Sequence, residues 1–119
     1  MYFTTGTFQT DLYVTIPGRE PNRACTTSVA IFDMGYVNGK LYGWAEYASP
    51  SGIYEINPEN GQCTLAVAST SELFFALDGN AADGLLYGYS EYGASGLYSI
   101  NPTTGEKHRI STGPVGHFP

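Results

Sequence analysis

The stretch "LYGWAEYASPSGIYEINPENG", residues 41–61, is followed by a near copy, "LYGYSEYGASGLYSINPTTG", residues 86–105. When the preceding segments from Gly39 and Gly84 are included, 13 of 22 paired positions are identical. The similarity extends upstream, where "VAIFDMGYVNG" corresponds to "FFALDGNAADG" at the same spacing of 45 residues. A period of this length is typical of propeller blades and of some helical arrays.

Each copy divides into four short runs that are rich in β-branched and aromatic residues and are bounded by Gly, Pro, Asn or Asp. The runs are 29–32, 41–47, 53–57 and 62–68 in the first copy and 74–77, 86–92, 97–101 and 106–112 in the second. This pattern predicts β-strands and hairpins, and no segment sustains a helical period. Asn-Gly and Asp-Gly before the second run favour tight hairpin turns, because both central residues of such turns need positive φ. Four antiparallel strands in one 45-residue unit predict a propeller blade.

The motif "LYxINPxTGE" after "DGxLYG" resembles the degenerate blades of secreted and bacterial β-propellers, in which a Leu-Tyr strand precedes an Asp/Asn-Pro-x-Thr-Gly turn. The resemblance covers about residues 29–113. It implies the fold and says little of function, since such blades serve enzymes, lectins and scaffolds.

The ends of the chain predict a third, divided blade. In "TDLYVTIPG", Leu12-Tyr13 corresponds to Ile53-Tyr54, which makes residues 1–28 strands two to four of a first blade. Residues 29–70 form the second blade and 71–113 the third, and 114–119 align with the missing first strand. Three blades do not close a ring. We therefore expect one all-β domain over residues 1–119, with two chains closing a six-bladed ring as a homodimer, unless the chain is a fragment of a longer propeller.

The composition excludes several classes of function. The net charge is −6, with five Lys and Arg against eleven Asp and Glu, so the chain lacks the basic surface that nucleic acid or an anionic membrane attracts. No stretch approaches the length of apolar sequence that spans a membrane. The N-terminus has neither the basic nor the apolar region of a signal peptide. The compartment stays unknown, with an extracellular or secreted location favoured.

The second run of each copy carries the candidate ligand site. Alternation places Leu41, Gly43, Ala45 and Tyr47 on one face and Tyr42, Trp44 and Glu46 on the other. The aromatic residues at repeated positions are expected to fill the space between blades. Glu46 and its counterpart Glu91 are harder to explain by packing, because a carboxylate needs a partner. They serve either as repeated structural hydrogen-bond acceptors or, beside aromatic rings, as sugar ligands. The predicted ligand-binding residues are Trp44, Glu46, Tyr47, Tyr89, Glu91 and Tyr92.

Other polar residues point to structure rather than chemistry. Asp33 and Asp78 follow the first runs and predict Asx turns. His108 is expected on an outer strand, and His117 in the closing strand. Cys25 and Cys63 are compatible with one disulfide or with two separate buried thiols, and their spacing fits neither metal nor redox chemistry.

No catalytic, metal or cofactor motif is present: Gly-x-Ser-x-Gly, a phosphate loop and His-Glu-x-x-His are all missing from the sequence. We therefore expect a binding module that is not an enzyme, with lectin-like recognition of glycans as its function. Two alternatives stay open, a structural or protein–protein interaction propeller and a fragment of a larger propeller enzyme. Its expected partners are a second copy of the chain, glycans, or another protein.

Overall fold

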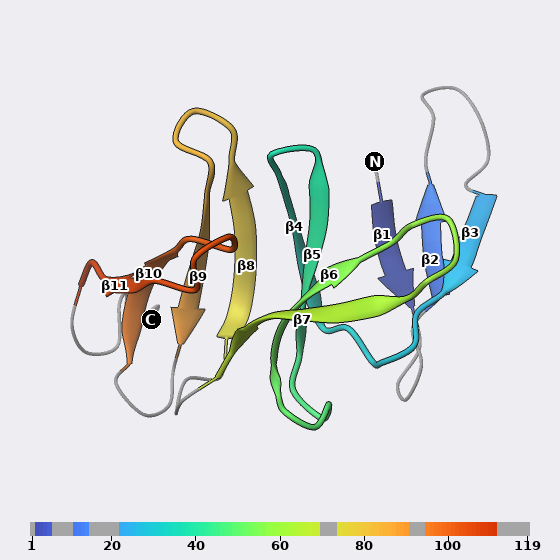
Figure 1. Cartoon of the computed structure of the whole chain (residues 1–119), viewed down its shortest axis with the longest axis horizontal. Coiled ribbons are helices and arrows are strands. Elements are labelled where there is room, and N and C mark those ends of the chain that lie inside the picture. The colour runs from blue at the N-terminus through green and yellow to red at the C-terminus, as the bar shows by residue number, and fades with distance from the viewer. Residues whose placement is uncertain (1, 6–10, 15–21, 70–73, 91–94, 112–119) are drawn as a thin grey trace, which may run out of the picture.

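The computed structural model describes residues 2–5, 11–14, 22–69, 74–90 and 95–111, which form three antiparallel sheets and no helix. The first sheet has the order β1-β2-β3, the second β4-β5-β6-β7 and the third β11-β10-β9-β8. The strands are β1 (Tyr2–Thr5), β2 (Asp11–Val14), β3 (Asn22–Thr26), β4 (Asp33–Val37), β5 (Lys40–Ala45), β6 (Gly52–Ile56), β7 (Cys63–Ala68), β8 (Phe74–Asn80), β9 (Leu85–Ser90), β10 (Gly96–Ile100) and β11 (Lys107–Arg109). The second sheet lies between the other two (Figure 1). The predicted all-β class and the two four-stranded units are confirmed.

The Asn-Pro turn is the same in both repeats. Gly61 N donates to Asn57 O (2.7 Å) and Gly105 N donates to Asn101 O (2.8 Å). The Asn side chain also accepts a backbone N–H two residues on, from Glu59 in the first copy. Both glycines have positive φ, 78° and 80°, a conformation that glycine adopts without strain. The repeated motif thus joins the third and fourth strands of each sheet.

The predicted first strand of the second unit is wrong. The sequence places it at residues 29–32, whereas β4 spans Asp33–Val37. Asn38 and Gly39 both have positive φ (56° and 74°) and form a tight turn, so the residues directly before it pair with β5, with Val37 opposite Lys40. Residues 29–32 precede the strand, where Phe32 N donates to Trp44 O (2.9 Å).

The tight hairpin predicted at Asp83-Gly84 is also wrong. Strand β8 continues past the predicted end at Leu77 to Asn80, which pairs with Leu85. The connection is therefore wider than in the second sheet, and of its Asp-Gly pair only Gly84 has positive φ (72°). Gly84 N donates to Asn80 O (2.9 Å), which closes this loop.

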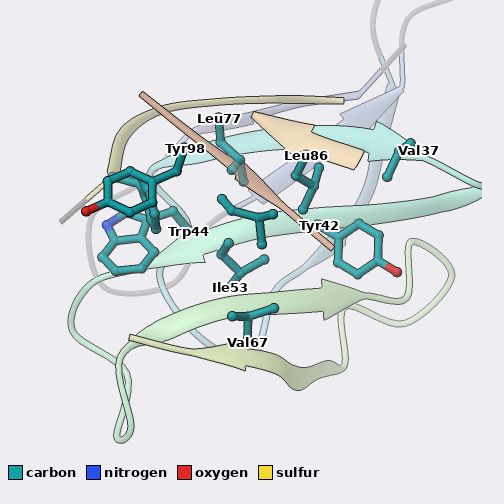
Figure 2. Close-up of a cluster of buried hydrophobic side chains, with 10 residues drawn as sticks. Val37, Tyr42, Trp44, Ile53, Val67, Leu77, Leu86 and Tyr98 are labelled. Carbon is teal, nitrogen blue, oxygen red and sulfur yellow. The ribbon is translucent and has the colours of Figure 1, made fainter. Parts of the chain in front are cut away.

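Alternation along β5 divides the buried residues into two clusters, as predicted. Tyr42 and Trp44 belong to the cluster between the second and third sheets, whereas Leu41 and Ala45 belong to the cluster on the opposite face. The inter-sheet cluster comprises Val37, Tyr42, Trp44, Ile53, Val67, Phe74, Leu77, Leu86, Tyr98 and Ile100 (Figure 2). Both faces of the second sheet are therefore buried.

Close backbone contact joins β4 to β8. A Cβ on Gly79 would lie 2.3 Å from Tyr36 O, so the strands could not approach this closely with a larger residue. Asp33, at the start of β4, connects the same two strands: its Oδ2 accepts Leu77 N (2.8 Å) and its Oδ1 accepts Met34 N (3.0 Å). The predicted Asx turn at Asp33 is therefore wrong, because the carboxylate bridges two sheets.

Burial of tyrosines leads to a prediction for alkaline conditions. The pKa of Tyr42 is raised, first because burial disfavours the phenolate and then because the Glu55 carboxylate is near, while Lys40 acts in the opposite direction. Burial also raises the pKa of Tyr54. A raised folded-state pKa stabilises the protein below the ordinary tyrosine value of about 10, and this contribution is lost as the pH rises through the folded-state value.

We therefore expect the urea midpoint to fall above pH of about 10. A Tyr42→Phe variant should lose less stability over this range than the parent protein, because its ring has no proton to release. Circular dichroism at a series of pH values measures both curves. Equal slopes for parent and variant would contradict the assignment to Tyr42.

Candidate functional site

Trp44 lies inside the protein. Its side chain is 1% exposed and packs edge-to-face against Phe74, with ring centroids 5.4 Å apart. Phe74 in turn packs against Tyr98 at 5.7 Å. The indole N–H of Trp44 has no hydrogen-bond acceptor within the described residues. A ligand cannot stack on the ring of Trp44 in the way that the sequence predicted, because the third sheet covers this ring.

Tyr47 is strongly exposed, at 75%, the highest value among the aromatic side chains whose burial the structure describes. It packs edge-to-face against Phe32, which is 44% exposed, with ring centroids 5.3 Å apart and an interplanar angle of 85°. We call this pair the aromatic corner. The neighbouring Glu46 is half-buried. The structure therefore places Tyr47 at the surface with Phe32 as its aromatic neighbour, whereas Trp44 is buried. The prediction that Tyr47 and Glu46 bind a ligand stays a prediction.

Phe32 was missed because it occurs in an apolar run that the sequence assigns to a buried strand. Comparing the two copies of the repeat could have identified Phe32. The counterpart of Phe32, 45 residues further along the chain, is Leu77, which is buried between the sheets. An aromatic residue that replaces a buried aliphatic one in a repeat, and that lies outside the strand, is a candidate for a surface role.

The second predicted group of site residues is only partly described. Tyr89 lies in β9 and is half-buried, far along the sequence from the aromatic corner. Glu91 and Tyr92 lie outside the described residues, as do His117 and the predicted closing strand 114–119. The prediction of a repeated site therefore stays a prediction.

The remaining polar residues have structural contacts. His108 is in the outer strand β11, as predicted, and its Nε2 lies 2.7 Å from Glu106 Oε1 at the surface. Cys63 is a half-buried free thiol, and nothing is described of the Cys25 side chain. Asp78 is exposed, and its Oδ1 accepts Gly79 N (2.9 Å).

The described surface includes two shallow depressions. One, of about 430 Å³, lies where the end of β3 meets the turn between β6 and β7 and is lined by Thr26, Thr27, Ser28, Asn60, Gly61 and Gln62. Its polar lining belongs to a backbone contact, in which Ser28 N donates to Gly61 O (2.9 Å). The other, of about 300 Å³, lies beside the exposed ring of Tyr36. Neither contains the aromatic corner.

Among the described residues there is no group of three or more His, Cys, Asp or Glu side chains that could hold a metal ion. A search of the same residues for a helix long and apolar enough to cross a membrane found none. Comparison with protein-family models, with curated proteins and with solved structures gave no match to this chain. The functional argument therefore depends on the geometry of the chain itself.

Proposed function

We propose that this chain is a non-catalytic binding module built from β-propeller blades, and that it binds carbohydrate at the aromatic corner. Two consecutive four-stranded meanders, each with the same Asn-Pro turn between its third and fourth strands, support the assignment to blades. The three-stranded first sheet fits a blade that lacks one strand. In this proposal two copies of the chain close a six-bladed ring, because three blades leave an open arc.

The observation that carries the binding function is the exposed pair Phe32 and Tyr47. The other repeated aromatic residues of the second sheet, Tyr42, Trp44 and Tyr54, are buried, whereas this pair is left at the surface. Two perpendicular rings offer an apolar surface for the C–H face of a sugar. In this proposal Glu46, which precedes Tyr47 in the chain, supplies a carboxylate that accepts hydroxyl hydrogen bonds. Weak binding at each site would be compensated by multivalency in a ring of two chains.

The second candidate is a propeller with a structural or protein–protein interaction role. It is supported by the burial of Tyr42, Trp44 and Tyr98, since these repeated aromatics are fully explained by packing between sheets. Under this function the aromatic corner would contact protein rather than sugar.

A glycan array tests the proposal directly. We expect the parent protein to bind a subset of glycans, and Tyr47→Ala to weaken that binding at least tenfold, which is about 1.4 kcal/mol. Glu46→Ala should weaken it as well. Tyr36→Ala is the matched control, because Tyr36 is also an exposed tyrosine of the second sheet (57%) but lies outside the aromatic corner.

Two outcomes contradict the proposal. One is a parent protein that binds no glycan, which favours the structural function. The other is an equal loss of binding in Tyr47→Ala and Tyr36→Ala, which would mean that the aromatic corner is not the site. Thermal melting of all variants excludes loss of folding as the cause.

A further inference from the structure

The third sheet has one covered and one open face. Leu86 is fully buried against the second sheet, and a Cβ on Gly88 would lie 2.7 Å from Phe74 Cδ1 on the same side. Because side chains alternate along a strand, Tyr87 and Tyr89 lie on the opposite face. Leu97 pairs directly with Tyr89 and shares that face. Among the described residues no sheet covers this side.

The open face repeats the composition of a face that is buried elsewhere in the same molecule. In the second sheet Trp44 pairs with Ile53, and both are 1% exposed beneath the third sheet. In the third sheet Tyr89 pairs with Leu97 in the same register, but both are only half-buried.

The outer strands extend this correspondence. In β7, Ala66 comes directly after the residue that pairs with Tyr54, and it packs against the inter-sheet cluster. At the equivalent position of the third sheet, Ile110 comes directly after the residue that pairs with Tyr98, and it is 55% exposed. We define the open face by Tyr87, Tyr89, Leu97 and Ile110.

A carboxylate at the edge of this face makes the correspondence more specific. Asp33 uses one oxygen for the N–H of the next residue and the other for Leu77 N of the following sheet (2.8 Å). Asp78, at the same position of the repeat, uses Oδ1 for Gly79 N (2.9 Å) in the same way. It is exposed, and among the described residues no following sheet donates a second N–H. Its other oxygen matches the position from which Asp33 accepts the inter-sheet bond.

We propose that the open face of the third sheet is a docking surface for a second copy of this chain, and that the outward side of that copy's first sheet occupies it. The inference deepens the proposed ring closure and rests on it. It follows from continuity of the contact between the second and third sheets, whose centre is an aromatic residue paired with an aliphatic one.

A second copy fits this surface better than an unrelated partner. The surface presents the same pairing of an aromatic with an aliphatic residue that the chain already uses to pack one of its own sheets against the next. Two head-to-tail arcs that use the same contact twice form a closed ring.

Sedimentation equilibrium of the chain over a range of concentrations tests the proposal. The monomer has a mass of 12.8 kDa, and we expect twice this mass for the parent at high concentration. Tyr89→Lys should weaken association at least tenfold, because a charge would be buried at the centre of the contact. Tyr36→Lys, the matched control on another surface, should leave association unchanged.

A parent protein that stays monomeric throughout overturns the proposal. Equal dissociation in Tyr89→Lys and Tyr36→Lys would overturn it too, because the loss would then not be specific to the open face. Circular dichroism of each variant establishes that it is folded. The outcome is independent of the glycan array, since association is measured without ligand and the two experiments change different residues.

Discussion

Replacing Trp44 by alanine is expected to lower the free energy of unfolding by about 3–5 kcal/mol, the range for removing a large aromatic side chain from a packed core. The ring is 1% exposed and contacts Phe74 of the third sheet edge-to-face. The variant should therefore lose contact between two sheets rather than within one. Trp44→Phe, which keeps an aromatic ring, should lose substantially less.

Urea denaturation followed by circular dichroism measures this effect. Fluorescence is unsuitable for comparing the variants, because Trp44 is the single tryptophan of the chain. Tyr47→Ala is the control: an exposed side chain at the end of the same run is expected to change stability by no more than about 0.5 kcal/mol. If Trp44→Ala and Tyr47→Ala had similar midpoints, the assignment of Trp44 to the core would be contradicted.

The contrast between Trp44 and Tyr47 shows how far the sequence alone could go. Alternation correctly divided β5 between two faces, because the period of a strand depends only on backbone geometry. It could not tell that the Trp44 face is covered, since that depends on how closely β4 and β8 approach. The two strands can approach closely because glycines such as Gly79 have no side chain at the contact. This role of Gly79 can be recognised only when the carbonyl group that faces it in the other strand is known.

Strand boundaries failed for a related reason. The two upstream segments align residue by residue, yet β4 ends at a tight Asn-Gly turn whereas β8 ends at a wider loop closed on Asn80. Hydrophobicity placed the strand at residues 29–32, but the pairing register is fixed by the turn. Two segments that align without an insertion therefore form hairpins of different length. A prediction based on the repeat alone could not have shown this difference, because it assigns the same hairpin to both copies.

Asp33 was predicted to make a local turn because the sequence shows which residues adjoin it in the chain. It does not show that the Leu77 amide of the next sheet lies close to it in space. Replacing Asp33 by alanine is expected to lower the free energy of unfolding by about 1.5–3 kcal/mol, the range for a hydrogen bond to a charged group. The Leu77 N–H loses its acceptor (2.8 Å) beside the buried inter-sheet cluster. Its hydrogen-exchange protection should fall further than that of amides within β9 and β10.

The repeat supplies a matched control for this experiment. Asp78 holds the same position as Asp33 and makes the same bond to the next residue, but it makes no bond to a following sheet in the described chain. Measured at dilution, where the chain is monomeric, Asp78→Ala should change stability by no more than about 0.5 kcal/mol. Equal losses in the two variants would mean that the local bond, and not the bridge between sheets, accounts for the stability. A loss confined to Asp33→Ala would instead establish that the Asp33 carboxylate holds the third sheet to the second.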